Sequence, residues 1–102
     1  MESLFAHKEI SPMHTKSIWD CIHKPSPHKA ALLAFLRGEA HKRPGGFPEL
    51  LKNVLEDTYF AAVHYYDDGT YAWRTDIIYY FDKYDLELPD AFVQHVLAQV
   101  SA

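Results

Sequence analysis

Residues 58–73 read TYFAAVHYYDDGTYAW, so that two aromatic stretches enclose the tetrapeptide Asp-Asp-Gly-Thr. Tyrosine, phenylalanine, valine and tryptophan favour β-strands, and an Asp-Gly pair between two such stretches is typical of a tight turn. The sequence therefore predicts an antiparallel β-hairpin over about residues 59–74.

Two registers of this hairpin are compatible with the turn residues. A two-residue turn at Asp68 and Gly69 would place Tyr66 opposite Tyr71. A type I turn followed by a left-handed Gly69 would instead place Tyr65 opposite Tyr71, and a shift of one residue exchanges the two faces of a strand. We predict the second register because it separates apolar from polar side chains better. Its apolar face would carry Tyr59, Ala61, Val63, Tyr65, Tyr71 and Trp73.

The segments around the hairpin carry helix signals. Proline is favoured at the first position of a helix, and serine is a common N-cap just before it. Ser11-Pro12, Ser26-Pro27, Pro48, Thr75 or Asp76, and Pro89 mark the predicted helix starts. We therefore expect an α+β fold with about five short helices packed with the antiparallel β-hairpin, in a single domain over residues 1–102 with a single core. The predicted core residues are Trp19, Leu32, Leu36, Val54, Trp73, Phe81, Phe92 and Val96.

The C-terminal third carries an ordered set of motifs. They are Asp68-Gly69, Trp73, Ile77, Tyr80, Leu88-Pro89, Phe92 and His95. In this order residues 68–95 resemble a group of small uncharacterised bacterial hypothetical proteins, which combine an Asp-Gly turn, a tryptophan strand and a Leu-Pro-x-x-Phe helix start. The chain departs from that group at Arg74, where proline is usual, and at Tyr79 and Tyr84, where histidine is usual. The resemblance implies a helix–turn–helix end to the domain, no known function and no site residue.

Charge is distributed unevenly along the chain. Residues 1–52 carry 8 Lys/Arg and 5 Asp/Glu, a net charge of +3, whereas residues 53–102 carry 2 and 9, a net charge of −7. Two interpretations follow. Folding could mix these charges over one surface, or it could leave an acidic face that attracts a basic partner.

The sequence shows no recognised pattern for catalysis or for metal binding. It has no C-x-x-C, H-E-x-x-H or G-x-S-x-G motif and no phosphate-binding glycine loop. Cys21 and His23 are two residues apart, so on a helix they would point to different faces. We therefore predict no catalytic residue, no metal site and no cofactor, and favour a binding protein over an enzyme.

The aromatic content points to a binding surface. Nine Tyr, Phe and Trp residues lie between Tyr59 and Phe81, more than one hairpin face and one helix stripe can bury. We expect Tyr66 and Tyr79 to stay exposed, and tyrosine beside aspartate is typical of protein interfaces. The predicted contact residues are Tyr66, Asp67, Asp68, Tyr79 and Asp82. The predicted partner is a basic protein, as for immunity or antitoxin proteins that block basic toxins, or a second copy of this chain.

Other classes of function fit the sequence less well. The alternative is a small-molecule-binding protein or small enzyme with an aromatic-lined pocket near His64 and Trp73. Nucleic acid is disfavoured because the pI is about 5.9 and the acidic half would repel phosphate. No apolar run reaches the roughly 20 residues of a membrane helix, which predicts no membrane contact. The single cysteine predicts a reducing, cytoplasmic setting.

Overall fold

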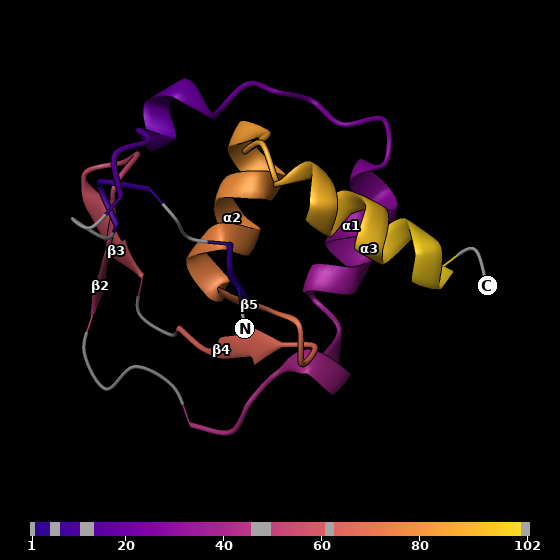
Figure 1. Cartoon of the computed structure of the whole chain (residues 1–102). Coiled ribbons are helices and arrows are strands. Elements are labelled where there is room, and N and C mark those ends of the chain that lie inside the picture. Colours follow the sequence, from indigo (N-terminus) through magenta and orange to yellow (C-terminus); the bar gives the residue numbers. More distant parts are fainter. Residues whose placement is uncertain (1, 5–6, 11–13, 46–49, 61–62, 101–102) are drawn as a thin grey trace.

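The structure is a computed structural model that describes residues 2–4, 7–10, 14–45, 50–60 and 63–100. Within these residues the chain forms three α-helices and two small β-sheets (Figure 1). The α+β class is therefore confirmed, but the prediction of about five helices is too high. None of the helices in the described part is long and apolar enough to cross a membrane.

Three of the predicted helices are present. They are α1 (Lys29–Leu36), α2 (Thr75–Tyr84) and α3 (Asp90–Val100). The helix predicted from Ser11-Pro12 begins outside the described residues, and its described part contains only a 3-10 turn at Ile18–Asp20. A second 3-10 turn spans Glu39–His41.

The prediction of a helix that starts at Pro48 is wrong within the described residues, where the chain forms a β-hairpin instead. Strand β2 (Leu51–Asn53) pairs antiparallel with β3 (Thr58–Phe60). The cause is Asn53, whose buried side chain accepts hydrogen bonds from the backbone N–H groups of Leu55 and Glu56. Asparagine that bonds the following backbone in this way forms a turn, which ends any helix there. Pro48 itself lies outside the described residues.

The main sheet contains three strands in the order β1-β5-β4. Strand β4 (Tyr65–Asp67) is antiparallel to β5 (Tyr71–Arg74), and β1 (Glu2–Ser3) pairs with β5 in parallel. The hairpin predicted over residues 59–74 is thus divided, because residues 58–60 pair with β2 and only residues 65–67 pair with β5.

Both predicted registers are wrong as well. Tyr66 lies opposite Trp73, and the Asp68 N–H donates to the Tyr71 carbonyl at 3.1 Å, which places the turn at residues 69–70. Gly69 adopts a φ of +91°, a left-handed conformation that glycine tolerates. The register stacks Tyr66 on Trp73 at 6.2 Å between ring centroids, so the tyrosine covers the core rather than facing solvent.

The core lies between the main sheet and the three helices. Six of the predicted core residues are buried: Leu32, Leu36, Trp73, Phe81, Phe92 and Val96. Val54 is partly buried against the same cluster. The prediction that Trp19 belongs to the core is wrong, because the 3-10 turn directs Ile18 inward and leaves Trp19 55% exposed.

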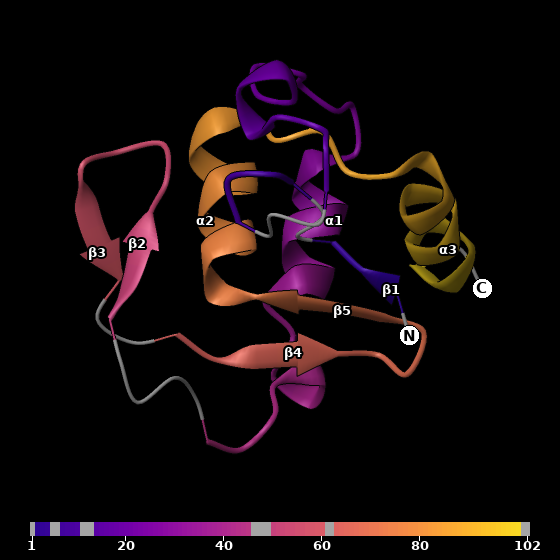
Figure 2. The same cartoon turned by 60° about the vertical axis from the view of Figure 1, so that its left-hand side comes forward.

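The β2–β3 hairpin stands apart from the main sheet. In both views it lies beside α2, and α3 lies at the opposite side of the molecule (Figure 1 and Figure 2). The Phe60 ring contacts the rings of Tyr79 and Tyr80 of α2, with centroids 5.3 and 5.9 Å apart. The arrangement separates two surfaces, one on the hairpin and one around the start of α3.

Candidate functional site

The structure places the five predicted contact residues in three different environments. Tyr66, Asp67 and Asp68 lie together at the end of β4 and the start of its turn. Tyr79 and Asp82 both lie on α2, but Tyr79 contacts the β2–β3 hairpin and Asp82 contacts α1. A single acidic and aromatic patch made of all five residues is not formed.

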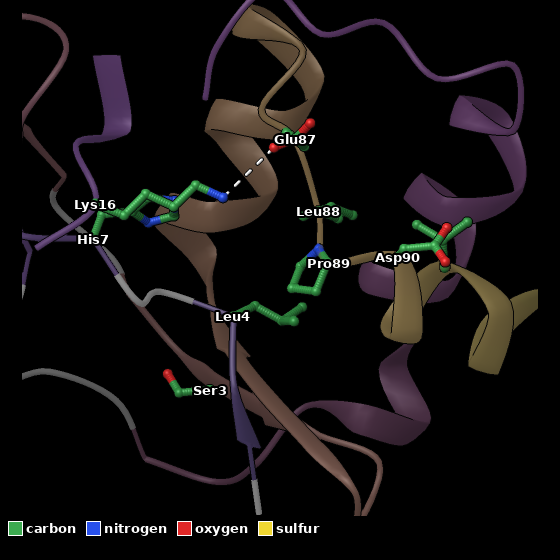
Figure 3. A pocket seen from close by; sticks show the side chains of 9 residues that line it. Ser3, Leu4, His7, Lys16, Glu87, Leu88, Pro89 and Asp90 are labelled. Carbon is green, nitrogen blue, oxygen red and sulfur yellow. Dashed lines mark ion pairs between the residues drawn. The ribbon is translucent and has the colours of Figure 1, made fainter. Parts of the chain in front are cut away.

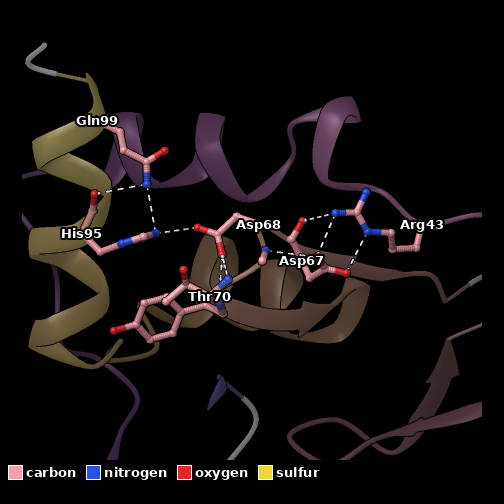
Figure 4. A network of polar contacts seen from close by, with 8 residues as sticks. Arg43, Asp67, Asp68, Thr70, His95 and Gln99 are labelled. Atoms are coloured by element: carbon pink, nitrogen blue, oxygen red, sulfur yellow. Dashed lines mark hydrogen bonds and ion pairs between the residues drawn. The ribbon is translucent and has the colours of Figure 1, made fainter. Parts of the chain in front are cut away.

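Asp68 joins the β4–β5 turn to α3. Its Oδ1 accepts hydrogen bonds from the N–H groups of Thr70 and Tyr71, and its Oδ2 lies 2.5 Å from Nε2 of His95 (Figure 4). Burial raises the pKa of this carboxyl, but the hydrogen bonds from Tyr71, His95 and Thr70 outweigh that effect and lower it. Asp68 is therefore an internal connector that stays ionised at neutral pH.

Asp67 and Asp82 each pair with an arginine from the basic half of the chain. Arg43 donates to both carboxylate oxygens of Asp67, at 2.7 and 2.8 Å, and these contacts hold the pKa of Asp67 below its usual value (Figure 4). Arg37, which directly follows α1, donates to Asp82 at 2.8 Å. These contacts favour the first interpretation of the charge asymmetry, because the carboxylates of one half neutralise cations of the other.

His64 and Trp73, the alternative pocket residues, do not line one cavity together. Trp73 is fully buried, and its Nε1–H donates to the carbonyl of Leu36 at 3.0 Å. His64 lines an open cavity of about 400 Å³ whose described lining residues do not include Trp73. The His64 ring bonds the Gly45 carbonyl through Nδ1 at 2.8 Å. The predicted aromatic wall is consequently part of the core.

Glu56 anchors the tip of the β2–β3 hairpin to α2. One carboxylate oxygen, Oε2, accepts from the hydroxyls of Tyr79 and Tyr84 at 2.7 and 2.6 Å and from Nζ of Lys83 at 2.9 Å. Hydrogen bonds from Tyr79, then Tyr84 and Lys83, lower the pKa of Glu56 to about 2. Tyr79 is accordingly half-buried beneath the hairpin, so the prediction that it stays exposed is wrong.

This cluster predicts a specific loss of stability in acid. Glu56 has a folded pKa of about 2 and a reference value of 4.5, so its contribution is complete above pH 4.5 and is lost as the pH falls toward 2. Urea unfolding across this window should show a steeper fall in the free energy of unfolding for the wild type than for Glu56→Gln. Asp57→Asn, at an exposed neighbour, is the control and should keep the wild-type slope. Parallel profiles for wild type and Glu56→Gln would contradict this assignment.

The outer face of the β2–β3 hairpin carries exposed apolar side chains that the sequence analysis missed. Lys52 lies opposite Tyr59 on this face, and Leu50 precedes Lys52 by two residues. Tyr59 is 62% exposed and Leu50 is 64% exposed, more than any other described large apolar residue. The predicted hairpin with β5 would bury Tyr59 on its apolar face, but Tyr59 pairs with β2 and is turned outward. We call Leu50, Lys52 and Tyr59 the outer hairpin face.

The hairpin also has open edges. Within the described ranges no strand pairs with the outer edge of β2 or of β3. The outer edge of β4 differs, because Lys42 bridges to Tyr66 and the Arg43 N–H donates to the Tyr65 carbonyl at 2.9 Å. Unpaired edge groups can form hydrogen bonds with another strand, so the hairpin is the candidate interaction element.

Neither a metal centre nor an activated thiol is assembled in the described part of the chain. Its His, Cys, Asp and Glu side chains form no group of three or more that could hold a metal ion. Cys21 is buried, and burial raises the pKa of its thiol, which opposes formation of the reactive thiolate. Comparisons with protein-family models, with curated proteins and with solved structures found no match.

Proposed function

We propose that this chain is a protein-interaction module whose partner is a second copy of itself, bound through the outer edge of β3. The observation that carries the proposal is the exposed Tyr59 on a two-stranded hairpin with an open edge. A sheet of two strands is marginal alone, and two hairpins joined edge to edge would form a four-stranded sheet.

The composition of the two edges favours β3 over β2. Strand β2 has Lys52 at its centre, and a twofold pairing of β2 would bring two lysines together. Strand β3 reads Thr58-Tyr59-Phe60 and carries no charge. An antiparallel β3–β3 pairing centred on Tyr59 would place the two tyrosines opposite each other, where aromatic contact adds to the backbone hydrogen bonds.

A second copy accounts for the surface better than a basic toxin-like partner. Such a partner would need free carboxylates, but Asp67, Asp68 and Asp82 already contact Arg43, His95 and Arg37 of the same chain. The carboxylates of Asp67 and Asp68 are largely shielded from solvent, so breaking their pairs would offset the gain from new ones. The outer hairpin face carries a single charged side chain, Lys52, and its edge contacts would be mainly backbone hydrogen bonds.

The oligomeric state tests the proposal. Sedimentation velocity of the wild type over a wide range of concentration should show a shift from the 11.8 kDa monomer to twice that mass. Tyr59→Lys should stay monomeric, because it places two charges opposite each other on the paired edge. Tyr65→Lys is the matched control, since Tyr65 is also exposed but its strand edge is covered by residues 42–43.

Two further measurements keep the test decisive. Circular dichroism and urea unfolding should show that Tyr59→Lys remains folded, because Tyr59 contributes little to the core. Amide hydrogen exchange at Tyr59 should slow as the wild-type concentration rises. A wild type that stays monomeric at every concentration, or a dimer that Tyr59→Lys leaves intact, would refute self-association through β3.

A further inference from the structure

A separate cavity lies between the N-terminal segment and the start of α3. Its volume is about 490 Å³, within the range typical of small-molecule sites. Apolar walls come from Leu4 next to β1 and from Leu88, Pro89 and Val93 around the start of α3 (Figure 3). These residues offer a surface for a small apolar body.

His7 lines this cavity and has an unsatisfied polar atom. His7 is only 5% exposed, and its Nδ1 atom has no hydrogen-bond partner. It is the sole buried side-chain nitrogen or oxygen in that condition among the described residues. Leaving such an atom unpaired is unfavourable, so native proteins rarely keep one without a ligand or a function.

The protonation state of His7 defines which groups it can bind. Burial first, and then the positive charge of Lys16, lower the pKa of the imidazole. The ring is therefore neutral at pH 7, with one nitrogen that donates and one that accepts. A hydroxyl can do either, so it satisfies the imidazole nitrogen in both tautomers.

The charged side chains at the cavity favour a cationic ligand. Lys16 and Glu87 form an ion pair at 3.6 Å with both side chains more than half exposed, a pair of little net strength (Figure 3). Asp90, the exposed first residue of α3, adds a second carboxylate. With His7 neutral, these groups sum to one negative charge.

We propose that this cavity binds a small primary amine with an apolar body that carries a hydroxyl group. Glu87 binds the ammonium group at the rim, Asp90 adds a second negative charge to the cavity wall, and Leu4, Leu88 and Val93 contact the body. The hydroxyl pairs with the imidazole of His7. A carboxylate of the same size is disfavoured because it adds a further negative charge to a cavity that already carries one net negative charge.

Three probes of matched size separate these contributions. Tyramine has the ammonium and the hydroxyl, phenethylamine lacks the hydroxyl, and 4-hydroxyphenylacetate replaces the ammonium with a carboxylate. In amide chemical-shift titrations the wild type should bind tyramine about tenfold more tightly than phenethylamine, as expected for one buried hydrogen bond. The carboxylate should bind more weakly than either amine, and the shifts should centre on Leu4, His7 and residues 87–93.

Variants assign the roles of the residues. His7→Phe should bind the two amines with equal affinity and should unfold at the same or higher urea concentration, because it removes an unpaired polar atom without leaving a partner unsatisfied. Glu87→Gln and Asp90→Asn should weaken both amines alike. Asp20→Asn, at an exposed carboxylate that does not line the cavity, is the control and should change neither affinity.

Three outcomes would overturn the proposal. The first is the absence of shifts at the cavity with all three probes, and the second is carboxylate binding as tight as that of tyramine. The third is an unchanged preference for tyramine in His7→Phe. Tyr59→Lys gives an independent reference, because Tyr59 does not line this cavity and its substitution should leave amine binding intact.

Discussion

Phe92→Ala is expected to lower the free energy of unfolding by about 3–5 kcal/mol. Phe92 is fully buried, and its ring lies 5.0 Å from Tyr71, 5.9 Å from Trp73 and 6.0 Å from Phe35 between centroids. These contacts connect α3 to β5 and to α1, so the cavity left by alanine would lie where three elements meet. Urea unfolding followed by tryptophan fluorescence measures the loss.

Val100→Ala provides the control on the same helix. Val100 is 55% exposed near the end of α3, and its truncation should change stability by no more than about 0.5 kcal/mol. A loss below about 1 kcal/mol for Phe92→Ala would contradict the packing of α3 on the core. The slope of unfolding with urea should be unchanged in both variants if folding remains two-state.

Asp76→Asn is expected to cost about 3–5 kcal/mol, as for other buried ion pairs that lose one partner. Asp76 is 1% exposed at the start of α2, and its carboxylate accepts from Nη2 and Nε of Arg74 at 2.8 and 3.1 Å. Asparagine keeps the shape but removes the charge. The buried Arg74 guanidinium then lacks the carboxylate that compensates its desolvation.

A double variant separates the charge effect from simple loss of packing. In Arg74→Met/Asp76→Leu both charges are replaced by apolar groups, and most of the stability lost in Asp76→Asn should return. The free energies of unfolding of the single and double variants give this comparison directly. If the double variant is less stable than Asp76→Asn, the pair contributes through hydrogen-bond geometry rather than through charge compensation.

The predicted contact residues show why the sequence did not reveal which side chains form the surface. Asp67, Asp68 and Tyr66 were correctly placed near one turn, because they are adjacent in sequence. Their contacts with Arg43, His95 and Trp73 come from other parts of the chain, and these contacts leave all three partly buried. Net charge along the sequence does not reveal which charges will pair across the fold.

The elements that the sequence determined by itself are those with local signals. Helices α1, α2 and α3 each have apolar residues at helical spacing, and Pro89 precedes the first residue of α3. Five of the six buried residues among the predicted core lie on these helices, where helical spacing places them on one face, and the sixth, Trp73, lies on β5. The Asp-Gly pair also indicates a turn between β4 and β5, although the turn residues and the register differ from those predicted.

Tertiary structure alone decided strand pairing, register and the cavity. Residues 58–60 favour a strand in either pairing, and the Asn53 turn together with the packing of Phe60 on α2 selects β2 as the partner. Likewise, His7, Lys16 and Glu87 meet at one cavity although up to 80 residues separate them in the chain. Helix and turn signals act over a few residues, whereas these features depend on contacts between distant segments, which propensity and spacing do not encode.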